Sequence, residues 1–246
     1  MRRARGLAFA VSGLVAVLTC VAATAATASP DGALDRARAV TARYEAHVRA
    51  DRPDLASRIG FDRCDDRLLP VTPSSLARDR AFLYTMAESI LVLQRTALSA
   101  AARVEVDRLA GRVIDETGAI RSEAWRRSSS PYLEMVRDAV MMAAKRPRVS
   151  PCERERRVLR RLRAVPEVLR AAEVNLASPI AADPDSEAAG WAALESDWRG
   201  TLPGLFAGCH DADRYADLVQ ADSLALASAR RFASVLRLRP HEAPSR

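Results

Sequence analysis

The sequence is organised around one apolar seam between Ser150 and Leu176. Ser150 can accept a hydrogen bond at a helix start, Pro151 suits the first helical position, and Glu153 can complete a capping box three residues after the cap. The seam alternates spacings of four and three through Val158, Leu162, Val165, Leu169, Ala172 and Leu176. This spacing predicts a long amphipathic helix that other helices must cover. Because Pro166 lies inside the pattern, we expect this central helix to be kinked.

Similar seams and caps predict helices on both sides of the central one. They lie at residues 31–50, 53–59, 73–97, 99–118, 130–146, 184–199 and 211–238. Sustained alternation of the strand type, with β-branched enrichment, is absent from the sequence. The sequence therefore predicts an all-α protein: a single bundle of about six or seven main helices with a long Pro-kinked central helix. This helical domain is expected to span residues 29–239, with a polar tail at 240–246.

Residues 1–28 have the composition of a signal peptide. Arginines at positions 2, 3 and 5 precede an apolar run, and the small residues Ala26 and Ala28 flank Thr27 as signal peptidase requires. We expect cleavage after Ala28 and a secreted or extracytoplasmic protein. Two alternatives are an uncleaved membrane anchor and lipidation at Cys20, although Thr19 fits poorly before a lipidated cysteine.

The charge of the chain is modest once the signal segment is set aside. Without its three arginines, 35 basic residues stand against 31 acidic ones, a net charge of +4. Acidic and basic residues are interleaved and aromatic residues are scarce, so the sequence does not predict a nucleic-acid surface. A dense arginine group on the central helix is a possible partner surface, suited to an acidic partner or a phospholipid head group. The group comprises Arg154, Arg156, Arg157, Arg160, Arg161 and Arg163, of which Arg154, Arg157, Arg160 and Arg161 are the predicted partner surface. The alternative is a solvated face whose charges pair with Glu153, Glu155 and neighbouring helices.

The cysteines and histidines indicate no metal site. Cys64, Cys152 and Cys209 remain after processing, so at most one disulfide can form within the chain, and the sequence does not say which. The histidines at 47, 210 and 241 form no pair close in sequence, and no Glu-x-x-His motif is present. His210 lies between Cys209 and Asp211, which we interpret as a helix start rather than a metal cluster. The sequence predicts no metal and no cofactor.

Motifs for nucleophilic catalysis are also missing from the sequence. It contains neither a Gly-x-Ser-x-Gly turn nor a glycine-rich phosphate loop. Residues 128–130 are three serines, which we interpret as a loop leading to a helix cap. The tryptophans at 125, 191 and 198 are expected to pack in the core or in a groove. We therefore predict no catalytic residues and a protein that is not an enzyme.

Four segments resemble the amino-terminal half of a known bacterial family. They are PDLASRIGF at 53–61, DDRLLPVTPSSL at 65–76, SSPYL at 129–133 and RLRAVPEVLRAAEVNL at 161–176. Together they resemble the domain of unknown function 885 family, whose members are usually exported, largely helical and about twice as long as this chain. The resemblance implies a relationship to gluzincin-type metallopeptidases, whose His-Glu-x-x-Pro-Gly-His zinc motif lies in the carboxyl half. No such motif occurs here, so no catalytic residue can be assigned from it. Arg161, Pro166 and Asn175 match the pattern and imply structural roles: the proline bends the helix, and the asparagine pairs with backbone near its end.

Three hypotheses for function follow from these patterns. The leading one is an exported, non-catalytic α-helical binding or interaction module of the cell envelope, with a protein as its partner. The alternative is the helical subunit of a split zinc peptidase whose catalytic half is on another chain. It predicts a large exposed apolar face. The third is a helical protein that binds lipid or peptide between its helices. Membrane contact is expected only through an uncleaved signal segment or lipidation at Cys20.

Overall fold

The predicted all-α class is confirmed. The computed structural model describes residues 30–177, 183–206, 208–209 and 212–240, and their regular structure is helical. The predictions for the signal segment, for His210 and for the tail beyond residue 240 concern residues outside these ranges. Seven described helices have 15 or more residues: α1 (Pro30–Asp51), α3 (Pro73–Gln94), α4 (Ala100–Arg121), α6 (Ser130–Ala144), α7 (Pro151–Asn175), α8 (Pro184–Leu205) and α9 (Ala212–Leu238). Shorter ones are α2 (Pro53–Arg58), the 3-10 helix η1 (Asp62–Cys64) and α5 (Ala124–Arg127).

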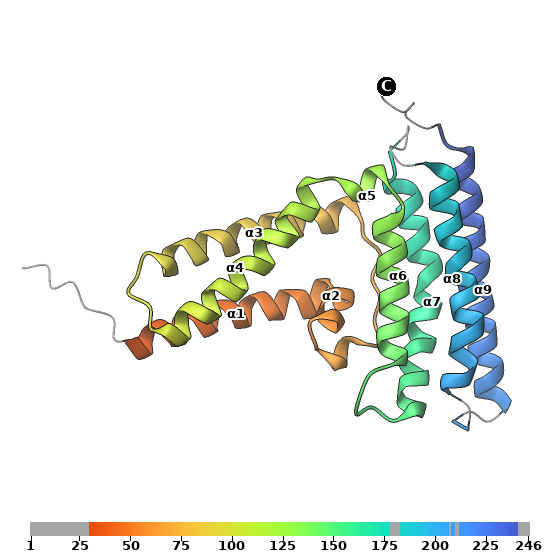
Figure 1. Cartoon of the computed structure of the whole chain (residues 1–246), viewed down its shortest axis with the longest axis horizontal. Helices are drawn as coiled ribbons and strands as arrows, with labels where there is room; N and C mark the ends of the chain where they lie inside the picture. The colour runs from red at the N-terminus through yellow and green to blue at the C-terminus, as the bar shows by residue number, and fades with distance from the viewer. Residues whose placement is uncertain (1–29, 178–182, 207, 210–211, 241–246) are drawn as a thin grey trace, which may run out of the picture.

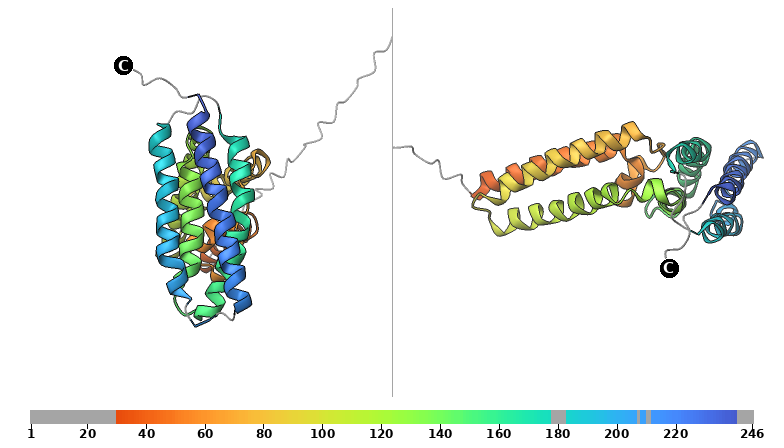
Figure 2. Two further views of the ribbon diagram at one scale, coloured as in Figure 1. Left: turned by 90° about the vertical axis from the view of Figure 1, so that its right-hand side faces the viewer. Right: turned by 90° about the horizontal axis from the view of Figure 1, so that it is seen from above.

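The helices divide into two packed groups, where the sequence predicts one bundle (Figure 1). We call α1 to α4 the arm and α6 to α9 the bundle. The helices of the arm run across the direction of those of the bundle, as the two further views also show (Figure 2). Each group buries its own apolar cluster. A connecting segment, residues 65–72, leaves the arm after η1, runs along the bundle and returns to the arm at α3 (Figure 1).

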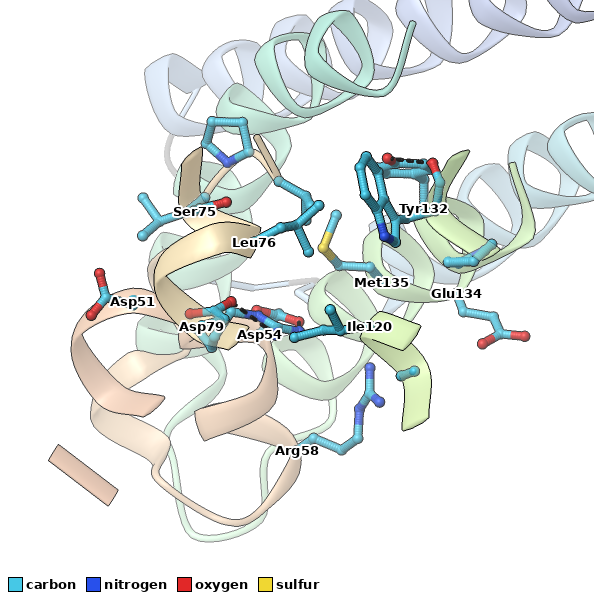
Figure 3. Close-up of a pocket in the computed structure, with 17 residues that line it drawn as sticks. Asp51, Asp54, Arg58, Ser75, Leu76, Asp79, Ile120, Tyr132, Glu134 and Met135 are labelled. Atoms are coloured by element: carbon cyan, nitrogen blue, oxygen red, sulfur yellow. Dashed lines mark hydrogen bonds and ion pairs between the residues drawn. The ribbon is translucent and has the colours of Figure 1, made fainter. Parts of the chain in front are cut away.

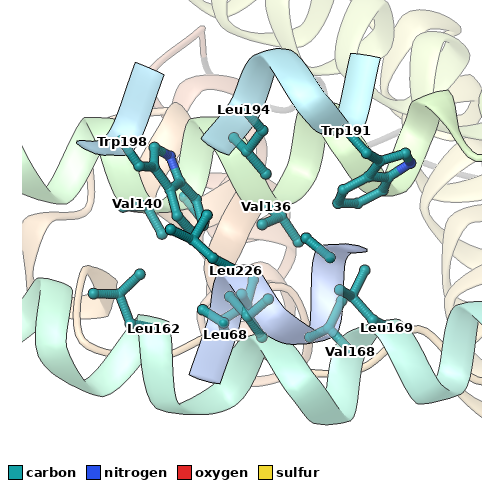
Figure 4. Packing of buried hydrophobic residues seen from close by; sticks show 14 of the residues in the cluster. Leu68, Val136, Val140, Leu162, Val168, Leu169, Trp191, Leu194, Trp198 and Leu226 are labelled. Carbon is teal, nitrogen blue, oxygen red and sulfur yellow. The ribbon is translucent and has the colours of Figure 1, made fainter. Parts of the chain in front are cut away.

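The seam of α7 forms the centre of the bundle, as predicted. All six seam residues are buried, and they pack with apolar residues of α6, α8 and α9 (Figure 4). Trp191 and Trp198 of α8 are buried in the same cluster, which confirms their predicted packing role. The helix α7 continues without interruption through Pro166 for 25 residues. The degree of its expected kink stays a prediction.

The predicted caps hold the long helices at their starts. Ser150 accepts a hydrogen bond from the Glu153 backbone N–H at 3.3 Å, but the Glu153 carboxylate pairs with Arg157 at 3.0 Å. The serine half of the predicted capping box is thus confirmed, and the carboxylate is engaged elsewhere. At α3, Thr72 and Ser75 form a complete capping box. Such caps satisfy N–H groups that a helix leaves unpaired in its first turn.

Asp222 is an acidic residue of α9 whose side chain is partly buried. Burial raises the pKa of its carboxyl, the nearby Glu195 raises it further, and Arg199 opposes the shift. One carboxylate oxygen is buried without a hydrogen-bond partner among the described residues. Since the folded-state pKa lies above the unfolded one, the ionised carboxylate costs stability at neutral pH. This cost disappears as the pH falls below the unfolded pKa of about 3.9.

The Asp222→Asn variant is therefore expected to be more stable than the wild type at pH 7, by up to about 1 kcal/mol after solvent screening. At pH 3 the two proteins should have nearly equal free energies of unfolding, because aspartate is then protonated in both states. Urea denaturation at the two pH values measures the difference. Asp197→Asn, an exposed change on α8, is the control. A variant no more stable than the wild type at pH 7 would contradict the assignment.

Candidate functional site

A cavity of about 200 Å³ lies where the arm meets the bundle. Its walls come from the adjoining ends of α1, α2, α3 and α4, and from the connecting segment, α5 and the first turns of α6 (Figure 3). We call it the cleft. Leu76, Ile120, Trp125 and Met135 give it an apolar side, and Figure 3 shows Leu76 and Met135 projecting toward one another from α3 and α6. Further apolar and neutral residues and six charged side chains complete the lining, and we call the apolar part the wall and the charged part the floor of the cleft.

Asn175, the last residue of α7, organises the apolar wall. Its Nδ2 donates to the backbone carbonyl of Val71 at 2.6 Å and to the hydroxyl of Tyr132 at 3.0 Å. Tyr132 in turn donates to the backbone carbonyl of Trp125 at 2.8 Å. Burial raises the pKa of Tyr132 to about 12, so its hydroxyl keeps the proton that it donates. The predicted pairing of Asn175 with backbone is thus found, but that backbone belongs to the connecting segment rather than to the end of its own helix.

The floor of the cleft is a polar network around Asp79. This carboxylate is buried and lies 3.0 Å from His47 Nε2 and 3.4 Å from Arg52 Nη1. The same guanidinium reaches Asp54 at 3.5 Å. His47 Nδ1 lies 3.3 Å from Asp51 Oδ2, so both ring nitrogens face carboxylates. The His47 ring also stacks on Phe82, with 3.8 Å between ring centroids, which fixes its orientation.

Glu116 of α4 adds a further carboxyl group behind this network. It accepts a hydrogen bond from the hydroxyl of Tyr44 on α1. Burial raises the pKa of Glu116, and burial together with the Glu116 hydrogen bond raises the pKa of Tyr44. The arm therefore places several acidic groups at its bundle-facing end. Ionised carboxylates in such a low-dielectric site need positive partners.

Three of the four arginines predicted as a partner surface bind the protein's own chain. Arg161 is fully buried and donates to the backbone carbonyls of Arg67 at 3.2 Å, of Cys64 at 3.0 Å and of Ala139. Arg157 donates to the carbonyl of Asp62 at 2.8 Å, and Arg160 pairs with Asp66 at 2.6 Å. These arginines fasten η1 and the connecting segment to the bundle.

The prediction of a partner surface is therefore wrong for Arg161 and Arg157, whose side chains are 0% and 16% exposed. Arg160 is exposed but already faces a carboxylate, and Arg154 is partly buried with its Nε unpaired. The physical reason is that residues 62–67 pack on this face of α7. The alternative interpretation is a solvated face with ion pairs; the ion pair with Glu153 is found for Arg157, but its side chain is not solvated.

Asp65 also connects the arm to the bundle through hydrogen bonds. Its fully buried carboxylate accepts two hydrogen bonds from Arg146, which follows α6, each at 2.6 Å. The hydroxyl of Ser57 on α2 also donates to it. Bidentate hydrogen bonds between an arginine and a carboxylate fix the relative geometry of the two side chains and also add to their interaction energy. The two groups of helices are thereby held at a defined relative position, and the cleft with them.

The cysteines, the three serines and Trp125 lie around these features. Cys152 and Cys209 form a disulfide, and Cys64 is a buried free thiol. The three serines at 128–130 lead into α6, and the carboxylate of Glu187 accepts hydrogen bonds there from the Ser128 hydroxyl and the Ser129 backbone N–H, both at 2.5 Å. They lead into the start of α6, as predicted, but the predicted cap is not found, because the side chain of Ser129 at the cap position accepts no backbone N–H of the first turn. Trp125 is partly buried and lies in the wall of the cleft.

Two further findings concern metals and membranes. Within the described residues, histidine, cysteine, aspartate and glutamate side chains do not gather in threes suited to hold a metal ion. The described helices include none with the length and apolar character that crossing a membrane requires.

Comparisons of the chain with models of protein families, with curated proteins and with solved structures yield no match. The resemblance to the domain of unknown function 885 family therefore stays a prediction.

The charged floor was not predicted from the sequence, although a pattern for it was present. On α3 the buried positions are 76, 79, 83, 86, 90 and 93, so Asp79 occupies a place in an otherwise apolar seam. A charged residue at such a place must find a buried partner. His47 and Arg52 are those partners, and both lie near the junction of α1 and α2.

Proposed function

We propose that this chain is an exported helical binding module of the cell envelope and that its ligand site is the cleft. The observation that carries the proposal is the cavity of about 200 Å³ between two separately packed groups of helices. Ligand sites occur preferentially at such junctions, and they combine mostly apolar linings with a few placed polar groups. Leu76, Ile120 and Met135 on one side and Asp79 on the other provide this combination.

The size of the cleft limits what it can hold. Pockets for drug-sized ligands are commonly about 300–1,000 Å³. The cleft is smaller, which suits a small molecule of one ring or a single side chain of a larger partner. A ligand there would contact α3 and α4 of the arm and α6 of the bundle at once. Binding would therefore stabilise the arrangement of the two groups.

The ion pairs among the charged residues at the floor of the cleft favour a binding function over a function in proton transfer. Both ring nitrogens of His47 face carboxylates, and the two oxygens of Asp79 face His47 and Arg52. His47, Asp79 and Arg52 are held in this way, and none of the three is directed at a ligand as a proton donor or acceptor. A ligand in the cleft would interact with the summed charge of these groups.

A fragment screen by protein-observed NMR on the methyl-labelled mature chain, residues 29–246, tests the proposal. Fragments are expected to shift the methyl signals of Leu76, Ile120 and Met135. Ala119 is an exposed residue in the cleft wall, so Ala119→Phe is expected to fill the space and weaken binding at least about ten-fold, which corresponds to about 1.4 kcal/mol. Ala101→Phe, an exposed change on the same helix outside the cleft, should leave binding unchanged.

Two results would contradict the proposal. The first is a screen in which no fragment shifts the cleft methyl signals at millimolar concentration. The second is equal binding by the wild type and the Ala119→Phe variant, which would place the bound fragments elsewhere on the molecule.

A further inference from the structure

The side chains lining the cleft carry an excess of negative charge. Four carboxylates line it, from Asp51, Asp54, Asp79 and Glu134, against the two guanidinium groups of Arg52 and Arg58. The buried carboxyl of Glu116 lies behind them and interacts with the charges of Arg52 and Asp79. Side chains of one sign in a recess with low-dielectric walls focus the field and attract ligands of the opposite sign.

The two arginines of the cleft are already engaged with carboxylates. Arg52 is shared between Asp54 and Asp79, at 3.5 and 3.4 Å. Arg58 pairs at 3.7 Å with Asp138 of α6, which does not line the cleft. Both guanidinium groups therefore already face a carboxylate, although the pair of Arg58 is long and both of its side chains are half exposed.

Two carboxylates of the cleft remain able to meet a ligand. Glu134 is exposed on α6 and forms no ion pair with the described residues. Asp51 is partly exposed, and its recorded partner is the imidazole of His47 at 3.3 Å. Figure 3 shows Asp51 and Glu134 at opposite ends of the cleft, with Leu76 and Met135 between them in this view and both carboxylates directed outward.

We infer that the cleft binds a small organic cation, an ammonium or guanidinium group on an apolar stem, held between the carboxylates and the apolar wall. This inference rests on the proposed binding function and adds the chemical class of the ligand. A free amine and a lysine or arginine side chain of a peptide share this chemistry. The partly exposed setting makes the attraction moderate and sensitive to salt.

Three probes of matched shape test the inference on the mature chain at pH 7.5. Phenethylamine carries a positive charge, 2-phenylethanol is neutral and 3-phenylpropionate is negative. Titrations followed by the methyl signals of Leu76, Ile120 and Met135 give the affinities at the cleft itself. Phenethylamine is expected to bind about ten-fold more tightly than the alcohol, and the carboxylate more weakly than both, since each ion pair at a partly exposed site contributes modestly. Raising the salt to 1 M should remove most of the preference.

Two variants identify the carboxylates responsible. The double variant Asp51→Asn/Glu134→Gln is expected to bind phenethylamine no better than the alcohol, and Glu134→Gln alone should lose part of the preference. The matched control Glu88→Gln/Asp107→Asn removes two exposed carboxylates outside the cleft and should behave as the wild type. N-acetyl-arginine methylamide in place of phenethylamine distinguishes a peptide side chain from a free amine as the source.

The outcomes separate the two proposals. Equal binding of the amine and the alcohol, or tighter binding of the carboxylate, would overturn the inference and leave the cleft as a site for another class of ligand. An unchanged amine preference in the double variant would also overturn it. If none of the probes shifts the cleft signals, the inference fails, and the fragment screen then decides whether the cleft binds any ligand.

Discussion

Replacing Arg161 with alanine is expected to lower the free energy of unfolding by about 3–5 kcal/mol. The fully buried guanidinium donates to the backbone carbonyls of Cys64, Arg67 and Ala139, and these carbonyls belong to three different segments. Alanine would leave them without this donor and would leave a cavity in place of one of the largest buried side chains. Urea denaturation followed by circular dichroism measures the loss.

The contribution of Arg161 comes from these hydrogen bonds more than from an ion pair. Burial lowers its pKa to about 10, so the cost of desolvation outweighs the attraction of Asp65. The closest approach to an Asp65 oxygen is 3.9 Å. Arg161→Lys keeps the charge but presents one compact ammonium group, so it is expected to recover little of the loss.

Arg163→Ala is the matched control for this prediction. Arg163 lies two residues along the same helix, is exposed and pairs with Asp217 at 3.1 Å, so its loss should change stability by less than about 1 kcal/mol. If Arg161→Lys has the same free energy of unfolding as the wild type, the positive charge alone is sufficient for stability at this position. A loss below about 1 kcal/mol in Arg161→Ala would contradict the assigned role.

The helices could be predicted from the sequence because their signals are local. Thr72, Ser99 and Ser150 cap the helices that the sequence assigns to them, each by accepting a backbone N–H three residues later. The seam from Val158 to Leu176 is buried throughout. Spacing of this kind identifies the buried face of a helix without any knowledge of its neighbours.

The division into an arm and a bundle could not be predicted in the same way. A seam shows which face is buried, but it does not show which helix covers it. Leu68, in a short segment without periodicity, joins the apolar cluster of the bundle, whereas Leu83 on the next helix joins that of the arm. Contacts between residues far apart in the sequence decide this partition.

The polar residues of the site were harder to interpret than the apolar ones. Arg161 lies on the same side of α7 as the buried residues Val165, Val168 and Ala172, and Asp79 fills a place in the seam of α3. Each is one charged residue among many on its helix. Only the packing of η1 and the connecting segment on α7, and of α1 on α3, shows which of these charges is enclosed.

Removing the disulfide between Cys152 and Cys209 is expected to lower the free energy of unfolding by about 2–4 kcal/mol. The two cysteines are 57 residues apart, and closing a loop of that length in the unfolded chain accounts for about 4 kcal/mol in the chain-entropy description. The bond joins the first turn of α7 to the connection between α8 and α9. Urea denaturation of the wild type and of Cys152→Ala/Cys209→Ala measures the difference.

Adding a reductant separates the disulfide from the effects of the substitutions. It should lower the stability of the wild type to that of the double variant and leave the double variant unchanged. Cys64→Ala is the matched control, because Cys64 is a buried free thiol whose loss should leave the response to reductant intact. Three alkylatable thiols in the wild-type chain of residues 29–246 before reduction, or a wild type insensitive to reductant, would contradict the prediction.

Because the disulfide between Cys152 and Cys209 needs an oxidising compartment, we expect the stability of the chain to depend on its export. Disulfides form and persist in oxidising compartments and are rare in the cytosol of mesophiles. A chain made in a reducing cytoplasm without residues 1–28 is therefore expected to contain three alkylatable thiols and to unfold at the urea concentration of the double variant. The exported chain should contain one such thiol and unfold at a higher concentration. If the two preparations contain equal numbers of alkylatable thiols, formation of the disulfide does not depend on export.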